Sequence, residues 1–207
     1  PDLIITTTGI QRPLVQKLTS YGFPVYPVPV PVSIYDILNN IIIVGGLIGE
    51  YERAHELSQS LLNRIFVLRE KFSFERRFKV YIEIDLGGPT IPGYFSHITS
   101  ALKIFGLDNI FSDSKQSYLY GFRVGDFPVL DLSEVVRRDP DIIIYESKSK
   151  KPSIEELLEI IRKRDWSNIK AVKENKLIVM PNDSLAHYGP SFFNELESLL
   201  EKIKSIL

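Results

Sequence analysis

The stretch Pro140-Asp141-Ile142-Ile143-Ile144 decides the fold. A turn comes directly before an unbroken apolar run, and such runs are typical of parallel strands buried on both faces. The same pattern occurs at Pro1-Asp2-Leu3-Ile4-Ile5. Each copy continues into a polar loop, an amphipathic segment and another apolar strand, so the chain contains an internal repeat of one structural plan. The sequence therefore predicts an α/β protein made of two lobes with parallel sheets.

The longest helical signal of the chain, residues 50–72, lies between the two copies. Apolar residues recur there at steps of three and four, and no proline or glycine interrupts them. At 1.5 Å per residue, about 22 residues form a rod of about 33 Å, roughly the diameter of a small domain. We expect this single long helix to join the lobes, with residues 1–49 as the remainder of an N-terminal lobe, residues 73–207 as the C-terminal lobe and a binding cleft between them.

Charge and composition exclude several classes of partner and site. The 25 basic and 26 acidic residues are spread along the chain, which argues against nucleic acid as a partner. The absence of cysteine excludes disulfides and thiolate metal sites, and it suits an oxidising exterior. The helix expected at residues 132–139 precedes the second copy of the repeat and has no counterpart before Pro1. We therefore expect an amino-terminal portion, signal region included, to be missing from this sequence.

Common enzyme signatures are absent from the sequence. It contains no Gly-x-Ser-x-Gly elbow, phosphate-binding loop or Gly-x-Gly-x-x-Gly motif. Of the three histidines, His55 and His97 fall in predicted helices, where packing or surface roles are the default. His187 falls in a loop that follows a predicted strand, where α/β proteins bind ligands. The sequence predicts no catalytic residue and no metal site belonging to the protein itself.

Several stretches, in order along nearly the whole chain, resemble the periplasmic metal-chelate binding proteins of ABC importers, of the ferric-siderophore and cobalamin type. The stretches are residues 1–5, 21–25, 46–49 with Ala54, 89–93, 106–111, 133–136, 140–144, 166–173 and 188–190. The resemblance implies an extracytoplasmic protein, with or without a lipid anchor, that captures an iron chelate (siderophore or haem) or a corrinoid and delivers it to an importer permease. It also implies that the full-length protein is a monomer and has no cofactor besides the transported ligand. Because a single long helix between lobes resists hinge closure, we expect only small lobe motion on binding.

The resemblance also implies site residues in the loops that face the cleft. The expected ligand contacts are Thr7, Thr8, Pro89, Thr90, Tyr94, Ser147, His187 and Tyr188. Aromatic faces and hydroxyl groups suit a bulky chelate. Glu134 matches the family's docking glutamate, which pairs with arginines of the permease. Ser191 stands where many family members have arginine, which makes strongly anionic catecholate chelates less favoured.

Two other functions remain open from the residues alone. The protein could be a tetrapyrrole metal chelatase of a related two-lobed fold, in which His187 and Glu83 would handle metal and proton. It could also be an interaction module with no small ligand, since no catalytic set is visible. A secretory signal upstream would argue against the chelatase, and binding of a chelate would argue against the interaction module.

Overall fold

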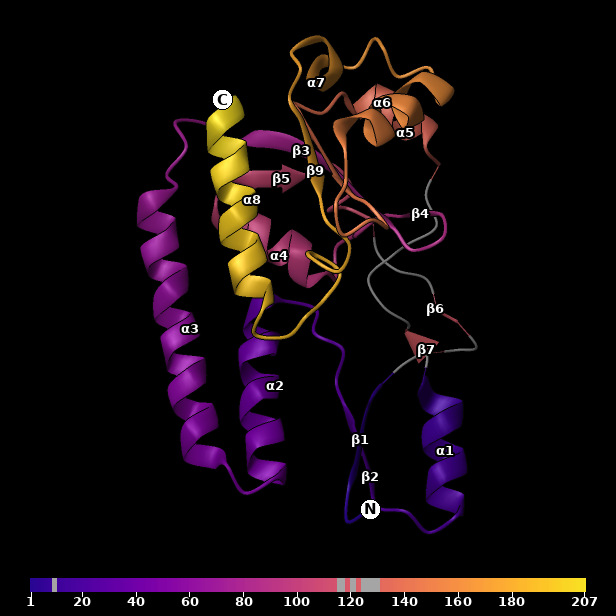
Figure 1. The fold of residues 1–207 in the computed structure, drawn as a ribbon, viewed down its shortest axis with the longest axis vertical. Helices are drawn as coiled ribbons and strands as arrows, with labels where there is room; N and C mark the ends of the chain where they lie inside the picture. Colours follow the sequence, from indigo (N-terminus) through magenta and orange to yellow (C-terminus); the bar gives the residue numbers. More distant parts are fainter. Residues whose placement is uncertain (9–10, 115–117, 120–121, 124–130) are drawn as a thin grey trace.

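The computed structural model describes residues 1–8, 11–114, 118–119, 122–123 and 131–207, and the statements below concern these residues. Near the amino terminus, strands β1 (Ile4–Thr7) and β2 (Val25–Val28) form a parallel pair, with helix α1 (Arg12–Ser20) between them in sequence. Figure 1 shows this pair and α1 at one end of the molecule, apart from the larger sheet. The apolar run at the start of the chain therefore forms a parallel strand, as the sequence predicts.

A larger, mostly parallel sheet makes up the other end of the molecule. Within the described residues its strands are β3 (Phe78–Asp85), β4 (Pro89–Thr90), β5 (Leu107–Asn109), β8 (Ile142–Glu146) and β9 (Leu177–Met180). Strand β3 pairs in parallel with β5 and β8, β8 pairs in parallel with β9, and β4 folds back antiparallel on β3. All five residues of β8 are buried. An unbroken apolar run suits this position because both faces of the strand are covered.

Helices cover both faces of the larger sheet. They are α4 (His97–Ile104), α5 (Ser133–Arg138), α6 (Ile154–Lys163), α7 (Lys170–Lys173) and α8 (Phe192–Ile206), and a short hairpin is formed by β6 (Tyr118–Leu119) and β7 (Phe122–Arg123). Ile82 belongs to the apolar cluster that includes residues of α4 and α8, whereas its neighbour Tyr81 belongs to the cluster around α6. Alternation with period two therefore assigns the side chains of β3 to two separate cores.

Two long helices connect β2 to the larger sheet. Helix α2 (Ile34–Leu47) begins at a capping box. The Ser33 side chain accepts from the backbone N–H of Asp36, and the Asp36 side chain accepts from the backbone N–H of Ser33. Helix α3 (Tyr51–Lys71) lies beside α2 (Figure 1). A Cβ atom placed on Gly45 would lie only 2.2 Å from the Cβ of Ala54. The close approach of the two helices therefore depends on this glycine.

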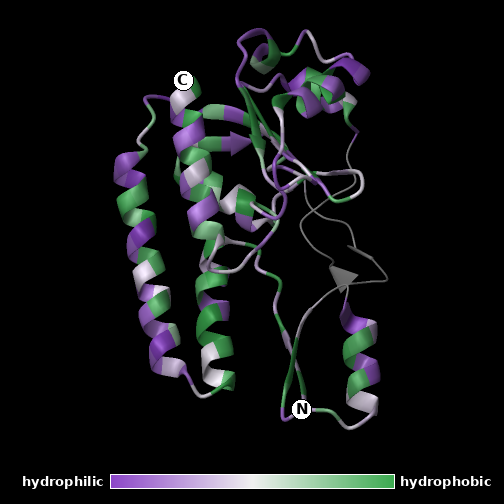
Figure 2. Cartoon of the chain, in the orientation of Figure 1, coloured by the Kyte–Doolittle hydropathy of each residue, from purple (hydrophilic) through white to green (hydrophobic). Residues whose placement is uncertain are grey.

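Helix α3 also packs against α8, one of the helices that cover the larger sheet. Arg64 and Lys71 form ion pairs with Glu197 at 2.7 Å and 2.9 Å, and Lys71 also pairs with Glu201 at 2.9 Å. Figure 2 shows α3 with alternating polar and apolar residues, whereas α2 is apolar over most of its length. The first turns of α2 belong to the same apolar cluster as α4 and α8.

These observations confirm the predicted α/β class with parallel sheets and the predicted long helix. The boundaries expected at residues 49 and 72 stay predictions. Among the described residues, no helix combines the length and apolarity that crossing a membrane requires.

Candidate functional site

The carboxyl ends of β3, β8 and β9 meet at one edge of the larger sheet. Glu146, the last residue of β8, stands in register with Ile84 on one side and Met180 on the other. Loops that follow parallel strands at such an edge are the usual ligand-binding positions of α/β proteins. Of the predicted residues, Pro89, Thr90, Ser147, His187 and Tyr188 all belong to segments that leave this edge.

The segment that follows β9 is held against the sheet by Glu146, which is 1% exposed. Its Oε2 accepts hydrogen bonds from the backbone N–H of Leu185 at 2.5 Å and of Ala186 at 3.0 Å, and from the hydroxyl of Ser184 at 3.3 Å. Burial raises the pKa of Glu146, and the hydrogen bonds act in the opposite direction. One buried carboxyl group therefore fixes the backbone directly ahead of His187.

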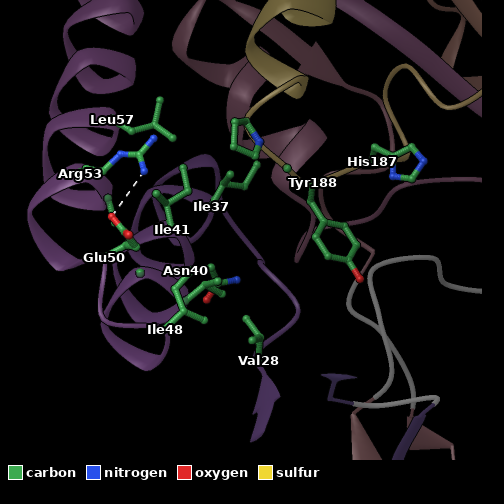
Figure 3. Close-up of a pocket in the computed structure, with 15 residues that line it drawn as sticks. Val28, Ile37, Asn40, Ile41, Ile48, Glu50, Arg53, Leu57, His187 and Tyr188 are labelled. Carbon is green, nitrogen blue, oxygen red and sulfur yellow. Dashed lines mark hydrogen bonds and ion pairs between the residues drawn. The ribbon is translucent and has the colours of Figure 1, made fainter. Parts of the chain in front are cut away.

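His187 and Tyr188 extend from this fixed segment. The His187 ring is exposed, and its Nε2 lies 3.4 Å from Asp183 Oδ1. Tyr188 is partly buried, and its ring meets the buried ring of His97 edge-on with centroids 5.8 Å apart. Figure 3 shows the Tyr188 ring on the side of His187 that faces helix α2. Tyr188 therefore presents an aromatic surface next to that helix.

A cavity of about 830 Å³ lies beside Tyr188, a size within the range of small-molecule sites. Its lining comes from β2, α2, α3 and the segment before α8. The lining residues are Val28, Ile37, Asn40, Ile41, Val44, Gly45, Ile48, Glu50, Arg53, Ala54, Leu57, His187, Tyr188, Gly189 and Pro190. Arg53 pairs with Glu50 at 3.5 Å (Figure 3). The cavity is therefore mainly apolar, and its arginine already has a carboxylate partner.

The other predicted contacts lie outside the lining of this cavity. Thr7 and Thr8 lie at the carboxyl end of β1. The N–H of Thr7 donates to Gln11 Oε1 at 2.9 Å, and the hydroxyl of Thr8 accepts from the N–H of Val30 at 3.1 Å. Pro89 and Thr90 form β4, where the Thr90 hydroxyl donates to the Gly88 carbonyl at 3.4 Å. Their ligand contacts stay predictions.

Tyr94 and Ser147 occupy two different environments. Tyr94 is 52% exposed and lines a second cavity of about 620 Å³ beside α4 and β5. Ser147 is 2% exposed, and its hydroxyl donates to Glu156 Oε2 at 2.5 Å while accepting from the N–H of Ser149 at 2.9 Å. The Ser147 hydroxyl thus donates to helix α6 and accepts from its own loop.

Glu134 lies in the first turn of α5 and forms ion pairs with Arg137 and Arg138. The hydrogen bond from Arg137 is the main cause of a lowered pKa at Glu134; desolvation opposes it, and the charges of Arg137 and Arg138 and the hydrogen bond from Arg138 add to the lowering. A carboxylate at the start of a helix is also favoured by the helix dipole. The docking role of Glu134 stays a prediction.

Asp85 and Tyr145 form part of the same sheet edge and were not predicted from the sequence. The Tyr145 hydroxyl donates to Asp85 Oδ2 at 3.1 Å, and Lys148 pairs with Asp85 Oδ1 at 3.1 Å. Burial raises the pKa of Asp85, but the hydrogen bonds from Gly87, Lys148 and Tyr145 outweigh it and leave the pKa below its usual value. The position of Asp85 and Glu146 as the last residues of their strands was the signal available in the sequence.

Glu83, which would handle the proton in the chelatase alternative, makes its contacts away from His187. It is buried in β3, where it pairs with Arg164 and accepts a hydrogen bond from Tyr81. Glu83 is not among the residues that line the cavity beside His187. In the described part of the chain, no group of three or more metal-ligating side chains could hold a metal ion.

Comparisons with known proteins agree with this architecture. A family described as periplasmic binding protein matches residues 1–184. Among solved structures, a possible iron-binding (periplasmic solute-binding) protein from Staphylococcus epidermidis has a TM-score of 0.79 at 20% identity, over 98% of this chain and 76% of that one. The periplasmic haem-binding protein RhuT from Roseiflexus sp. RS-1 has a TM-score of 0.78 at 17% identity, over 100% of this chain and 76% of that one. The periplasmic vitamin B12 binding protein BtuF of Vibrio cholerae has a TM-score of 0.73 at 18% identity, over 100% of this chain and 75% of that one.

Proposed function

The chain belongs to the periplasmic binding protein family, and from this membership we propose that it captures an iron chelate or a corrinoid outside the cytoplasm and delivers it to the permease of an ABC importer. The family consists of binding proteins, which confirms the prediction that the protein is not an enzyme and removes the chelatase alternative. Iron, where present, is part of the cargo.

The observation that carries this proposal is the apolar cavity beside Tyr188. Apolar walls with a few polar groups at the edge are the usual composition of sites for small organic ligands. Tyr188 offers an aromatic face, and the exposed His187 offers a nitrogen next to it. Each group suits the large, partly apolar surface of a metal chelate or tetrapyrrole.

The charges at the cavity favour some chelates over others. Arg53 is paired with Glu50, and Ser191 follows Gly189-Pro190, so the described lining offers little positive charge to an anionic ligand. A triply anionic catecholate complex would lose much of its hydration there without a matching partner. We therefore favour haem, a ferric hydroxamate or a corrinoid as cargo.

Isothermal titration of the protein tests this proposal with haem, a ferric hydroxamate, cyanocobalamin and a ferric catecholate as probes. We expect saturable binding of one of the first three, and at least about tenfold weaker binding by Tyr188→Ala, a loss of about 1.4 kcal/mol. Tyr21→Ala is the matched control, because Tyr21 is an exposed tyrosine outside the cavity lining. Absence of binding to all four probes would leave the interaction module as the remaining function.

Delivery to the permease would use Glu134 at the start of α5. A permease arginine would compete with Arg137 for this carboxylate, because the Arg137–Glu134 pair is open to solvent and such pairs contribute only about 0–1 kcal/mol. Charge reversal by Glu134→Lys should reduce importer-dependent uptake of the chelate while leaving chelate binding unchanged. Glu155→Lys on α6 is the control, because Glu155 is a surface glutamate that likewise lies in the first turn of its helix. Equal uptake by both variants would rule out the docking role.

A further inference from the structure

Two buried titratable side chains from different elements hold the backbone at Leu185, including the peptide group that joins it to Ala186. Glu146 ends strand β8 and accepts the Leu185 and Ala186 N–H groups. His97 begins helix α4, and its Nε2 donates to the Leu185 carbonyl oxygen at 3.0 Å. Both side chains are 1% exposed. Elements that are 49 residues apart in the sequence therefore converge on one peptide group, two residues before His187.

Each of the two side chains also has one polar atom without a partner. Among the described residues, Glu146 Oε1 and His97 Nδ1 are buried and make no hydrogen bond. More than about 90% of buried polar groups in folded proteins are paired, so each exception requires an explanation. Burial lowers the pKa of His97 to about 4, so the ring is neutral near pH 7. Apolar residues of similar size would fill this space without the cost of desolvation.

The contact extends beyond the backbone to Tyr188 itself. The His97 ring meets Tyr188 edge-on at 5.8 Å and Phe192 at 4.9 Å. Phe192 begins α8, so His97 lies between the cavity-side tyrosine and the first turn of the last helix. Edge-to-face pairs of this kind restrict the orientation of both rings. His97 therefore acts on the position of Tyr188 through its ring as well as through the Leu185 carbonyl.

We propose that Glu146 and His97 are positioning residues that clamp the Leu185 peptide and thereby set Tyr188 at the edge of the cavity. The consequence for ligand binding rests on the proposed function, whereas the clamp itself does not. This role explains the two unpaired atoms, Glu146 Oε1 and His97 Nδ1. The hydrogen bonds to the loop set the orientation of each side chain, and this orientation leaves its second polar atom without a hydrogen-bond partner.

Amide hydrogen exchange of the ligand-free protein tests the clamp directly. His97→Phe removes the donor to Leu185, and His97→Gln keeps a side-chain N–H at nearly the same reach. We expect exchange at Leu185 and Ala186 to be at least about tenfold faster in His97→Phe and in Glu146→Gln, and to be largely restored in His97→Gln. Ile161→Val is the control, since Ile161 lies in the other apolar cluster. Unchanged exchange at both amides in His97→Phe and Glu146→Gln would overturn the clamp.

Ligand affinity tests the consequence for the site, measured with whichever of haem, the ferric hydroxamate or cyanocobalamin the wild-type protein binds. His97→Phe should raise the Kd for that probe by about tenfold, with the Ile161→Val control unchanged and His97→Gln close to wild type. Faster exchange with an unchanged Kd would overturn the positioning role. A wild-type protein that binds none of the chelate probes would refute the transport proposal alone, because the exchange rates at Leu185 and Ala186 still decide whether the clamp exists.

Discussion

Arg164 forms a two-pronged ion pair with Glu83, with Nη1 to Oε2 at 2.5 Å and Nη2 to Oε1 at 2.8 Å. Glu83 is 3% exposed, and the Tyr81 hydroxyl donates to its Oε2 at 2.5 Å. The guanidinium also lies 4.8 Å from the ring centroid of Trp166. A buried carboxylate in the sheet is thus matched by a cation that directly follows α6.

Removing the cation should destabilise the fold strongly. Arg164→Met leaves the Glu83 carboxylate buried without its charge partner, and we expect a loss of about 3 kcal/mol in the free energy of unfolding. Urea denaturation followed by circular dichroism measures this loss. Adding Glu83→Gln to the variant should recover most of it, because the buried charge is then removed as well. A loss below about 0.5 kcal/mol in Arg164→Met, within the usual range for surface changes, would contradict the buried-charge account.

The contact of α2 with α3 should tolerate no side chain at Gly45. Gly45→Val forces the helices apart, because even a Cβ there would lie 2.2 Å from the Ala54 Cβ. We expect a loss of about 1–3 kcal/mol in the free energy of unfolding, measured in urea.

The adjacent Gly46 provides a matched control for Gly45. Within the described part of the chain, nothing lies within 4 Å of a Cβ placed on Gly46. Gly46→Ala should therefore be neutral or stabilise the helix by up to about 1 kcal/mol. Combining Gly45→Ala with Ala54→Gly should restore part of the stability lost in Gly45→Ala, since the clashing atom is then absent. Equal effects of alanine at both glycines would contradict the close approach.

Acid should destabilise the protein through His97. Its pKa is about 4 in the folded state, well below the ordinary value of 6.5, because burial disfavours the charged ring. The unfolded chain therefore binds a proton that the folded protein does not between about pH 6.5 and pH 4, and stability falls as the pH is lowered through this window. The full loss is on the order of 3 kcal/mol.

Comparison with His97→Gln isolates this histidine from other groups. Glu146 has a raised pKa and contributes in the opposite direction, since its folded-state carboxyl binds a proton more readily than the unfolded one. The pKa of Asp85 is lowered, so the stabilisation that Asp85 gives the folded protein is lost toward acid in both proteins. Urea denaturation from pH 7 to pH 4 should therefore show a shallower decline in His97→Gln than in wild type. Parallel curves would show that His97 titrates normally.

The ring of Tyr188 should matter more than its hydroxyl. Tyr188→Phe keeps the aromatic face beside the apolar cavity, so we expect the Kd for the preferred chelate to change by no more than about threefold, less than 1 kcal/mol. Titration calorimetry of Tyr188→Phe against Tyr188→Ala measures the difference. A loss in Tyr188→Phe as large as in Tyr188→Ala, together with a changed absorption spectrum of bound haem, would instead identify the phenol oxygen as an iron ligand.

Local sequence patterns predicted most of the secondary structure that positions the site. The run Ile142-Ile143-Ile144 predicted a strand buried on both faces, and β8 is that strand. The uninterrupted apolar periodicity from residue 50 predicted a long helix, and α3 runs from Tyr51 to Lys71. Such patterns are informative because strand and helix place side chains with fixed periods of 2 and 3.6 residues.

Fewer of the residues that form the site could be predicted from the sequence. His187 and Tyr188 were predicted, and they meet at the wall of one cavity. No residue of α2 or α3 was predicted as a ligand contact, although both helices line the same cavity. Glu146 was not singled out, although it holds the segment that carries both predicted residues. A glutamate at the end of an apolar run has no local signature of its partner 39 residues later.

The sequence by itself determined the class of fold, the positions of the main strands and helices, and the family, because these depend on periodicity and on motifs that occur in order along the chain. Only the tertiary structure decided which groups meet: Glu146 and His97 at the Leu185 peptide, Arg164 at Glu83, and Gly45 at Ala54. Contacts between segments distant in sequence are set by how the elements pack. The type of one residue therefore does not predict which distant residue it will contact.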